Sequence, residues 1–348
     1  MKFLLSIVIL FALSIGSIHA EVPLSAGLSL YEAYVDNLFQ TSDPYSDYVT
    51  LINLDASFDL GLSTSVLYDS DFNLFNEYSG LHNQTHHLSI DHEKVISDGQ
   101  GTLYFGGGIG LHDGTSEYAY YDYRSAGAYT KLKYYLTETS FLQSEYQIGY
   151  EDHHSYRDYS SLNNYAAIQI SKSFPTRTTA QARLEAGRRD YMNFDDNPNA
   201  TILTVIIRIA QSLTDLTGLQ LQYRWHNAPK STPYFTDSYY NIESPDDEHS
   251  YSGTEWQLAL KHYTIWNIML KGTLTRDKRS YNTSIVSNYE RNDTSITALL
   301  EFDKKISINS LLQNASIHIQ YLYKSTESSD PYYQSNTSIL SLGTRASF

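Results

Sequence analysis

Apolar and polar side chains alternate one by one along most of this chain, from about residue 25 to the last residue. The segment 216–227 carries large apolar side chains on one face and polar ones on the other: Leu219, Leu221, Tyr223 and Trp225 against Gln220, Gln222, Arg224 and His226. Successive side chains of a strand point to opposite faces, so a period of two predicts β-strands with one apolar and one polar face.

The alternation predicts sixteen strands, with fourteen and eighteen as alternatives. Each segment is at least as long as the ~9–11 residues that a tilted membrane-spanning strand needs. The first segment and 200–213 alternate less cleanly, and Ile206 falls on the polar face. The segments lie near 25–37, 47–60, 63–75, 84–96, 100–112, 125–137, 139–151, 163–174, 177–190, 200–213, 216–227, 252–264, 266–278, 294–306, 314–325 and 335–348.

The connections alternate in length as well. Most of those after even-numbered strands are very short, such as Gly61-Leu62, Glu138 and Pro175-Thr176, although one runs from Ser307 to Gln313. Those after odd-numbered strands are mostly long and polar: Asp113 to Arg124, Asp152 to Leu162, Tyr191 to Asn199, Ala228 to Tyr251, Arg279 to Asp293 and Thr326 to Gln334. Short periplasmic turns and longer outer loops are typical of an outer-membrane barrel with both termini in the periplasm. The loop 228–251 is long enough to cap the mouth or to fold inward.

The last segment, Ser335 to Phe348, has alternating apolar positions and stops on an aromatic residue. With this ending and the pattern over 25–348, the chain resembles the bacterial outer-membrane β-barrel superfamily, in the size range of porins. The resemblance implies that the strand ending in Phe348 is the assembly signal read by the barrel-assembly machinery. The chain departs from general porins in the loop Asp113 to Arg124, which is only moderately long where they have a long inward loop.

Composition adds to this interpretation. The sequence predicts a signal peptide at 1–20, which leaves 21–348 as a single barrel domain. Its parts are Lys2, the apolar run Phe3 to Ile18 and the cleavage site up to Ala20.

The absence of cysteine excludes disulfides and thiolate metal sites. The mean hydropathy is −0.39, as expected when only alternate residues face lipid. The 32 tyrosines suit the interface belts of a barrel, and a net charge of −15 argues against nucleic acid.

The polar face carries charges of both signs. Acidic residues fall on strands two to four: Asp55, Asp59, Asp69, Asp71, Asp91 and Glu93. Basic residues fall on strands six to thirteen: Lys131, Lys133, Arg183, Arg189, Arg208, Arg224, Lys261 and Lys271. An acidic arc facing a basic arc predicts a pore lining with a transverse field that orients polar solutes. The alternative is that these charges only solvate a wet interior and pair with neighbours such as Glu145, Glu151 and Glu185.

Other candidate chemistry is weak. Two histidine groups, His82, His86, His87 and His92, and His153 with His154, have carboxylates nearby, but adjacent histidines on a strand point to opposite faces. No Gly-x-Ser-x-Gly or other hydrolase motif is present. The glycine-rich run 106–110 lies inside a predicted strand, which favours close packing or barrel curvature over phosphate binding. We therefore predict no metal site, no cofactor and no enzymatic activity.

The sequence thus predicts an all-β, antiparallel up-and-down barrel in the outer membrane of a Gram-negative-type bacterium. The leading hypothesis is a passive, porin-like diffusion channel for small polar or ionic solutes. A plugged barrel whose acidic, tyrosine-rich outer loops serve adhesion, surface structure or scaffolding is the alternative, and a barrel-embedded hydrolase is the third. The expected partners are outer-membrane lipids, the barrel-assembly machinery and small polar solutes, with a homo-oligomer left open.

Overall fold

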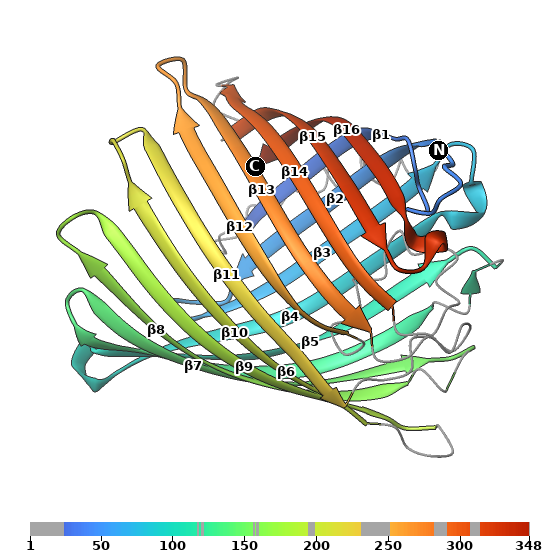
Figure 1. Cartoon of the computed structure of the whole chain (residues 1–348). Helices are drawn as coiled ribbons and strands as arrows, with labels where there is room; N and C mark the ends of the chain where they lie inside the picture. The colour runs from blue at the N-terminus through green and yellow to red at the C-terminus, as the bar shows by residue number, and fades with distance from the viewer. Residues whose placement is uncertain are drawn as a thin grey trace.

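The computed structural model describes residues 24–116, 118–119, 122–155, 157, 160–193, 199–230, 251–281, 291–306 and 314–347. The predicted signal peptide and Phe348 lie outside the described residues. The chain forms one closed barrel of sixteen antiparallel strands, each paired with its neighbours in sequence (Figure 1). The strands are β1 (Leu24–Val35), β2 (Asp47–Asp59), β3 (Thr64–Phe75), β4 (Asn83–Ile96), β5 (Gly101–Gly114), β6 (Tyr123–Thr137), β7 (Ser140–His153), β8 (Ser161–Phe174), β9 (Thr178–Tyr191), β10 (Asn199–Ser212), β11 (Thr217–Lys230), β12 (Tyr251–Tyr263), β13 (Ile268–Tyr281), β14 (Arg291–Ile306), β15 (Asn314–Ser328) and β16 (Ser335–Ser347).

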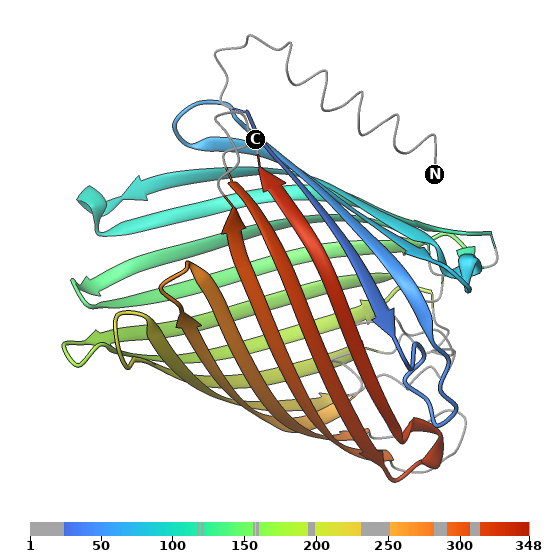
Figure 2. The same ribbon diagram turned by 90° about the horizontal axis from the view of Figure 1, so that it is seen from above.

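The first and last strands close the barrel. β1 pairs with β16 in a register that sets Gly27 opposite Ser347 and Val35 opposite Ile339, and Figure 2 shows the two strands lying side by side. Gly343 is required at this seam because the Tyr31 ring occupies the space where a Cβ would project. Closure leaves no unpaired sheet edge.

The all-β, sixteen-strand prediction is confirmed, and strand boundaries agree within three residues. The largest differences lie at the end of the barrel that carries the longer loops, which we call the long-loop end. There β13 runs to Tyr281 and β14 begins at Arg291, three residues beyond the predicted ends at 278 and 294. Backbone pairing continues past the apolar band because polar pairs, such as Arg279 opposite Asp293, extend the ladder without facing lipid.

The two faces of the sheet differ as predicted. Exposed apolar side chains lie at alternate positions around the barrel, among them Leu88, Ile109, Ile168, Leu300 and Leu342. The opposite face carries most of the charged and amide side chains. Ile206 is an exception, since its register partner is Arg183 and cross-strand partners share a face. Among the described residues, no helix is long and apolar enough to cross a membrane.

Candidate pore: the inner wall and the long-loop mouth

All fourteen predicted pore-lining residues lie on the same face of the sheet. Cross-strand register partners share a face of the sheet, so the register relates this face on each strand to the same face on the next. Examples are the pairs Asp55–Asp69, Lys131–Glu145 and Arg208–Gln222. Two contacts that pass over an intervening strand identify it as the concave inner face. Arg183 on β9 reaches Glu145 on β7 at 3.1 Å, and Arg345 on β16 lies 3.8 Å from Asp55 on β2.

The strand order sets the charges of opposite sign across the barrel from one another. The acidic set, Asp55, Asp59, Asp69, Asp71, Asp91 and Glu93, occupies β2, β3 and β4. Arg208, Arg224 and Lys261 occupy β10, β11 and β12, which are eight strands further along a ring of sixteen and therefore opposite. Arg183 and Arg189 on β9 and Lys271 on β13 flank this group, whereas Lys131 and Lys133 on β6 lie closer to the acidic strands.

Two of the predicted cations are neutralised by carboxylates. Arg183 lies 3.1 Å from Glu145 and 2.5 Å from Glu185, and its side chain is only 19 % exposed. Lys271 lies 2.5 Å from Glu301 on β14. For these two residues the alternative interpretation, local pairing along a polar wall, fits the geometry better than a contribution to a field across the lumen.

Other cations on the wall have neutral partners. Arg208 donates to the amide oxygen of Gln222 at 2.9 and 2.7 Å. Arg189 donates to the side-chain oxygen of Asn163 at 2.7 Å. Lys261 lies over the Tyr263 ring, 5.0 Å from its centroid. A neutral partner orients a cation without cancelling its charge, so the charges of Arg208 and Lys261 stay effective in the lumen.

A hollow in the inner wall gathers four cations near the short-turn end of the barrel. Its floor is made of small side chains, including Ala210, Gly218 and Ala259. Its cationic lining is Arg177, Arg208, Lys261 and Lys271, and we call it the basic pocket. Lys261 and Lys271 are direct register partners. Glu301 pairs with Lys271, and Asp215 lies 2.5 Å from Arg177, so Arg208 and Lys261 supply the uncompensated charge of the pocket.

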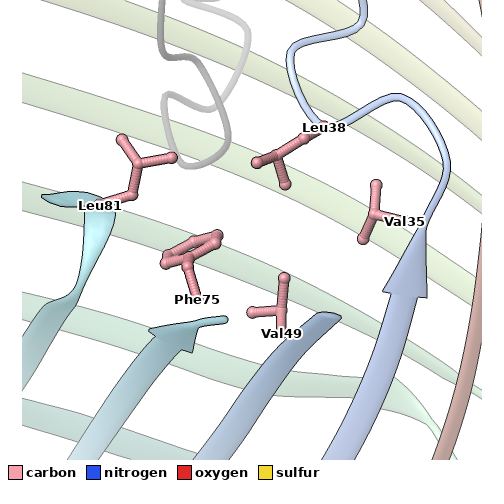
Figure 3. Packing of buried hydrophobic residues seen from close by; sticks show 5 residues of the cluster. All are labelled: Val35, Leu38, Val49, Phe75 and Leu81. Atoms are coloured by element: carbon pink, nitrogen blue, oxygen red, sulfur yellow. The ribbon is translucent and has the colours of Figure 1, made fainter. Parts of the chain in front are cut away.

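At the long-loop mouth, the connection 36–46 folds into the barrel. Leu38 is only 3 % exposed and packs with Val35, Val49, Phe75 and Leu81 (Figure 3). Val35, Val49 and Phe75 come from the inner faces of β1, β2 and β3. The buried apolar cluster therefore sits inside the mouth, and we call residues 36–46 the mouth shelf.

Hydrogen bonds fasten the mouth shelf at both ends. The Asn37 side-chain amide donates to the carbonyl of Thr41 at 2.8 Å and to that of Asn336 at 3.1 Å. At the other end, the buried Asp47 carboxylate accepts from the backbone N–H groups of Tyr48, Glu77 and Tyr78 at 2.7, 2.9 and 3.2 Å. These bonds join the shelf to β16 and to the loop after β3.

The middle of the mouth shelf reaches the opposite flank of the seam. Lys324 on β15 donates from Nζ to the side-chain oxygen of Gln40 at 3.0 Å. The backbone N–H of Ser42 donates to the Tyr332 carbonyl at 3.2 Å. The shelf is thus a bridged structure and not a free loop.

Two further loops interlock with the mouth shelf. Phe39, Tyr45 and Tyr78 form a group of edge-to-face rings with centroids 5.4–6.3 Å apart. Tyr118, from the connection after β5, packs against the apolar cluster. Asp122 ends that connection by accepting from the Gly114 N–H at 2.7 Å, and burial raises the pKa of its carboxyl above the ordinary value. Three successive connections therefore cover the β1–β6 side of the mouth.

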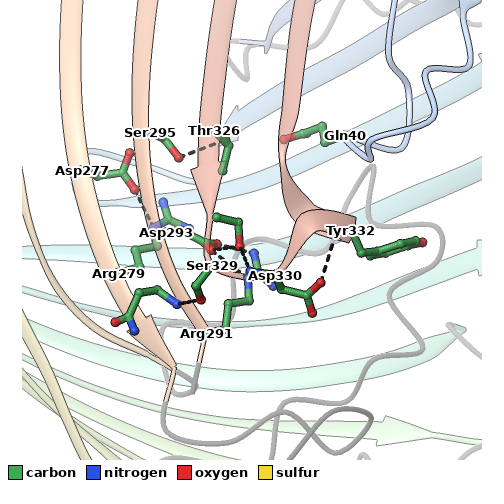
Figure 4. A network of polar contacts seen from close by, with 12 residues as sticks. Gln40, Asp277, Arg279, Arg291, Asp293, Ser295, Thr326, Ser329, Asp330 and Tyr332 are labelled. Atoms are coloured by element: carbon green, nitrogen blue, oxygen red, sulfur yellow. Dashed lines mark hydrogen bonds and ion pairs between the residues drawn. The ribbon is translucent and has the colours of Figure 1, made fainter. Parts of the chain in front are cut away.

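The β13–β15 side of the mouth is built from charges instead (Figure 4). Arg291 pairs with Asp293, and Arg279 lies 2.7 Å from Asp277. Ser328 donates to Asp293 at 2.6 Å, and the Arg291 guanidinium stacks on the Tyr333 ring, 3.5 Å from its centroid. This network fixes the strand ends through paired charges, so it adds little net charge to the mouth.

Sequence reasoning missed the mouth shelf. It assigned the capping role to the loop 228–251, of which residues 231–250 lie outside the described residues. The available signal was Leu38-Phe39, two large apolar residues directly after a strand and before a polar stretch. Within the ranges that the structure describes, no group of three histidine, cysteine or carboxylate residues lies close enough to hold a metal ion.

Comparisons with known proteins bear on the fold. No family model matches the chain, and no curated protein matches it. Among solved structures, Pseudomonas aeruginosa OpdK with vanillate is 12 % identical, with a TM-score of 0.54 over 93 % of this chain and 98 % of that one. A double variant of OccD1 (OprD) is 10 % identical, with a TM-score of 0.56 over 94 % and 97 %. CdiB from Acinetobacter baumannii is 12 % identical, with a TM-score of 0.57 over 93 % of this chain and 60 % of that one. These likenesses show that the chain has the fold of a bacterial outer-membrane β-barrel.

Proposed function

We propose that this protein is a passive diffusion channel for small polar and ionic solutes. The observation that carries the proposal is the placement of opposite charges across the inner wall of a closed sixteen-strand barrel. A barrel of this strand number encloses a water-filled lumen unless loops fill it. Size exclusion by the wall and the field between the two arcs then select solutes, with no chemical step.

The unneutralised cations favour anionic solutes. Arg208 and Lys261 keep their charge beside neutral partners, and the small floor of the basic pocket leaves room for a solute against the wall. One structural neighbour was solved with vanillate, which is an aromatic carboxylate. We extend that class to this chain and propose that small organic carboxylates pass along β9 to β13, with the carboxylate held transiently by Arg208 and Lys261.

The mouth shelf favours the same route. It occupies the β1–β6 side of the mouth, so it displaces the entry path toward the strands that carry most of the cations. A solute entering there meets Arg189 and Arg224 before it reaches the basic pocket. The acidic arc on the opposite wall then repels the anion and keeps it against the basic strands.

Single-channel recording of the refolded protein in a planar bilayer tests the proposal. We expect steady openings in potassium chloride, a reversal potential in asymmetric salt of the sign that marks anion preference, and brief blocks when vanillate is added on one side. A reversal potential of the opposite sign would show that the channel prefers cations. The proposal of a diffusion channel would then stand, but the preference for anionic solutes would be wrong.

The plugged barrel is the second candidate, because three interlocked connections already cover part of the mouth. A plugged barrel would show no conductance in the same experiment. The protein used would still have to show the heat-modifiable gel migration of a folded barrel. That result would end the channel proposal and direct attention to binding partners of the long loops.

A further inference from the structure

Two cations face the membrane side of the barrel on β13. Arg276 and Lys278 alternate with the inner-face residues Asp277 and Arg279, and they share their face with the exposed Leu274. Their register partners on β12 are Trp256 and Thr254, which confirms the outward face because Trp256 is 51 % exposed. A charge on this surface is unfavourable at mid-membrane and is tolerated near the headgroups, where an anionic lipid group can compensate it.

Nothing in the described chain supplies that compensation. Neither side chain takes part in a hydrogen bond, ion pair or ring contact with another residue. The outward positions next to them are neutral on both sides. They are Ser252, Thr254 and Trp256 on β12, and Asn292, Thr294 and Ile296 on β14.

Other outward cations toward the long-loop end have acidic neighbours. Arg188 on β9 lies 2.7 Å from Asp190, and Arg124 on β6 has Asp152 as its register partner. These charges can be balanced within the protein. The pair on β13 is therefore unusual in leaving two adjacent cations for a partner outside the chain.

The height of the pair fits the membrane interface. Lys278 lies three residues from the long-loop end of β13, and Arg276 lies five residues from it. The exposed Trp225 and Trp256 flank them, each five residues from the long-loop end of its strand, and the half-buried Tyr223 ring lies 4.6 Å from the Trp256 ring. Aromatic belts mark the level of lipid headgroups in membrane barrels.

We propose that Arg276 and Lys278 form a binding site for the phosphate of an anionic lipid in the leaflet at the long-loop end. Arginine offers a planar fork of donors and lysine a point charge, and together they match the oxygens of a phosphate. The Trp256 and Trp225 rings cover the apolar part of the same lipid below its headgroup. The site lies outside the lumen and does not depend on conduction.

Native mass spectrometry of the full chain in detergent tests this site. The probes are phosphatidate, whose headgroup is a bare phosphate, and zwitterionic phosphatidylcholine. The variants are Arg276→Gln with Lys278→Gln, the charge-conserving Arg276→Lys, and Arg188→Gln as a matched outward cation that already has an acidic partner. Heat-modifiable migration verifies that each variant is folded.

We expect the double variant to lose phosphatidate affinity on the order of tenfold, whereas Arg276→Lys and Arg188→Gln retain it. Phosphatidylcholine binding stays the same in all variants. Equal phosphatidate binding by the double variant and the parent protein would overturn the proposal. Inorganic phosphate in large excess separates the two sources of phosphate: retention of the lipid supports the lipid site, and its complete displacement overturns that assignment.

Discussion

The mouth shelf and the inner wall on the opposite side of the barrel are stabilised by different forces. On the β1–β6 side, the mouth shelf buries Leu38 against Val35, Val49 and Phe75, and buried hydrogen bonds close both its ends. On the β9–β13 side, the inner wall carries Arg208 and Lys261 beside neutral partners. Apolar burial makes the first side rigid and closed to solutes. Unneutralised charge makes the second side costly for folding but useful for attracting ions.

The largest effect is expected at Asp47, where one carboxylate holds three backbone N–H groups. Asp47→Ala removes the acceptor of all three donors. Hydrogen bonds to a charged group are each worth about 1.5–3 kcal/mol, and we expect a smaller total loss of about 4 kcal/mol, because Tyr48 and Glu77 are exposed and water can replace part of the lost bonding. The loss should appear as faster amide exchange in 36–46 and 76–82, with exchange in β9–β13 unchanged. A uniform increase around the barrel would show that the two sides do not behave independently.

A smaller change on the same side comes from its apolar contacts. Leu38→Ala opens a cavity in the cluster and should cost about 3 kcal/mol. The shelf then opens more often, so single-channel records should become noisier while the folded barrel persists. Leu62→Ala is the matched control, because Leu62 is fully exposed in a short turn. Equal noise in the two variants would contradict a structural role for the shelf.

The structures of these two regions could not be predicted equally well from the sequence. The strands and their inner faces follow from a period of two, which the lipid and the lumen impose on every strand, so all fourteen charges could be assigned to one face. The ion pairs on the inner wall were harder to predict. The contact of Arg183 with Glu145 passes over a strand and depends on the curvature of the wall. The mouth shelf was not predicted, since its anchor Asn336 lies 299 residues from Asn37. Its local signal is the apolar pair Leu38-Phe39 alone, which does not say where these side chains are buried.

On the basic side, neutralising two cations should change selectivity more than stability. We expect Arg208→Gln with Lys261→Gln to shift the reversal potential toward cations and to weaken vanillate block. The magnitude is about 1 kcal/mol per charge for a contact in a water-filled lumen, or roughly fivefold. Lys172→Gln is the control, because Lys172 is exposed over the Phe174 ring and its neighbours place it on the outward face. If both variants shift the potential alike, long-range surface charge and not the inner wall sets the preference.

The smallest effect is a pH dependence on the shelf side. Burial raises the pKa of Asp122, with Asp113 adding to the rise, while the Gly114 hydrogen bond and His112 oppose it. The closed connection 115–122 therefore binds a proton more tightly than the open one. Its stability is full below the ordinary aspartate range and falls as pH rises through the raised pKa, by well under ~1 kcal/mol for a group this accessible. Limited proteolysis of 115–122 should be slower at acidic than at neutral pH, after correction for protease activity with an unstructured peptide.

The control variant is Asp122→Asn, which stays uncharged throughout and should remove this difference. Persistence of the pH dependence in that variant would contradict a role for the Asp122 carboxyl.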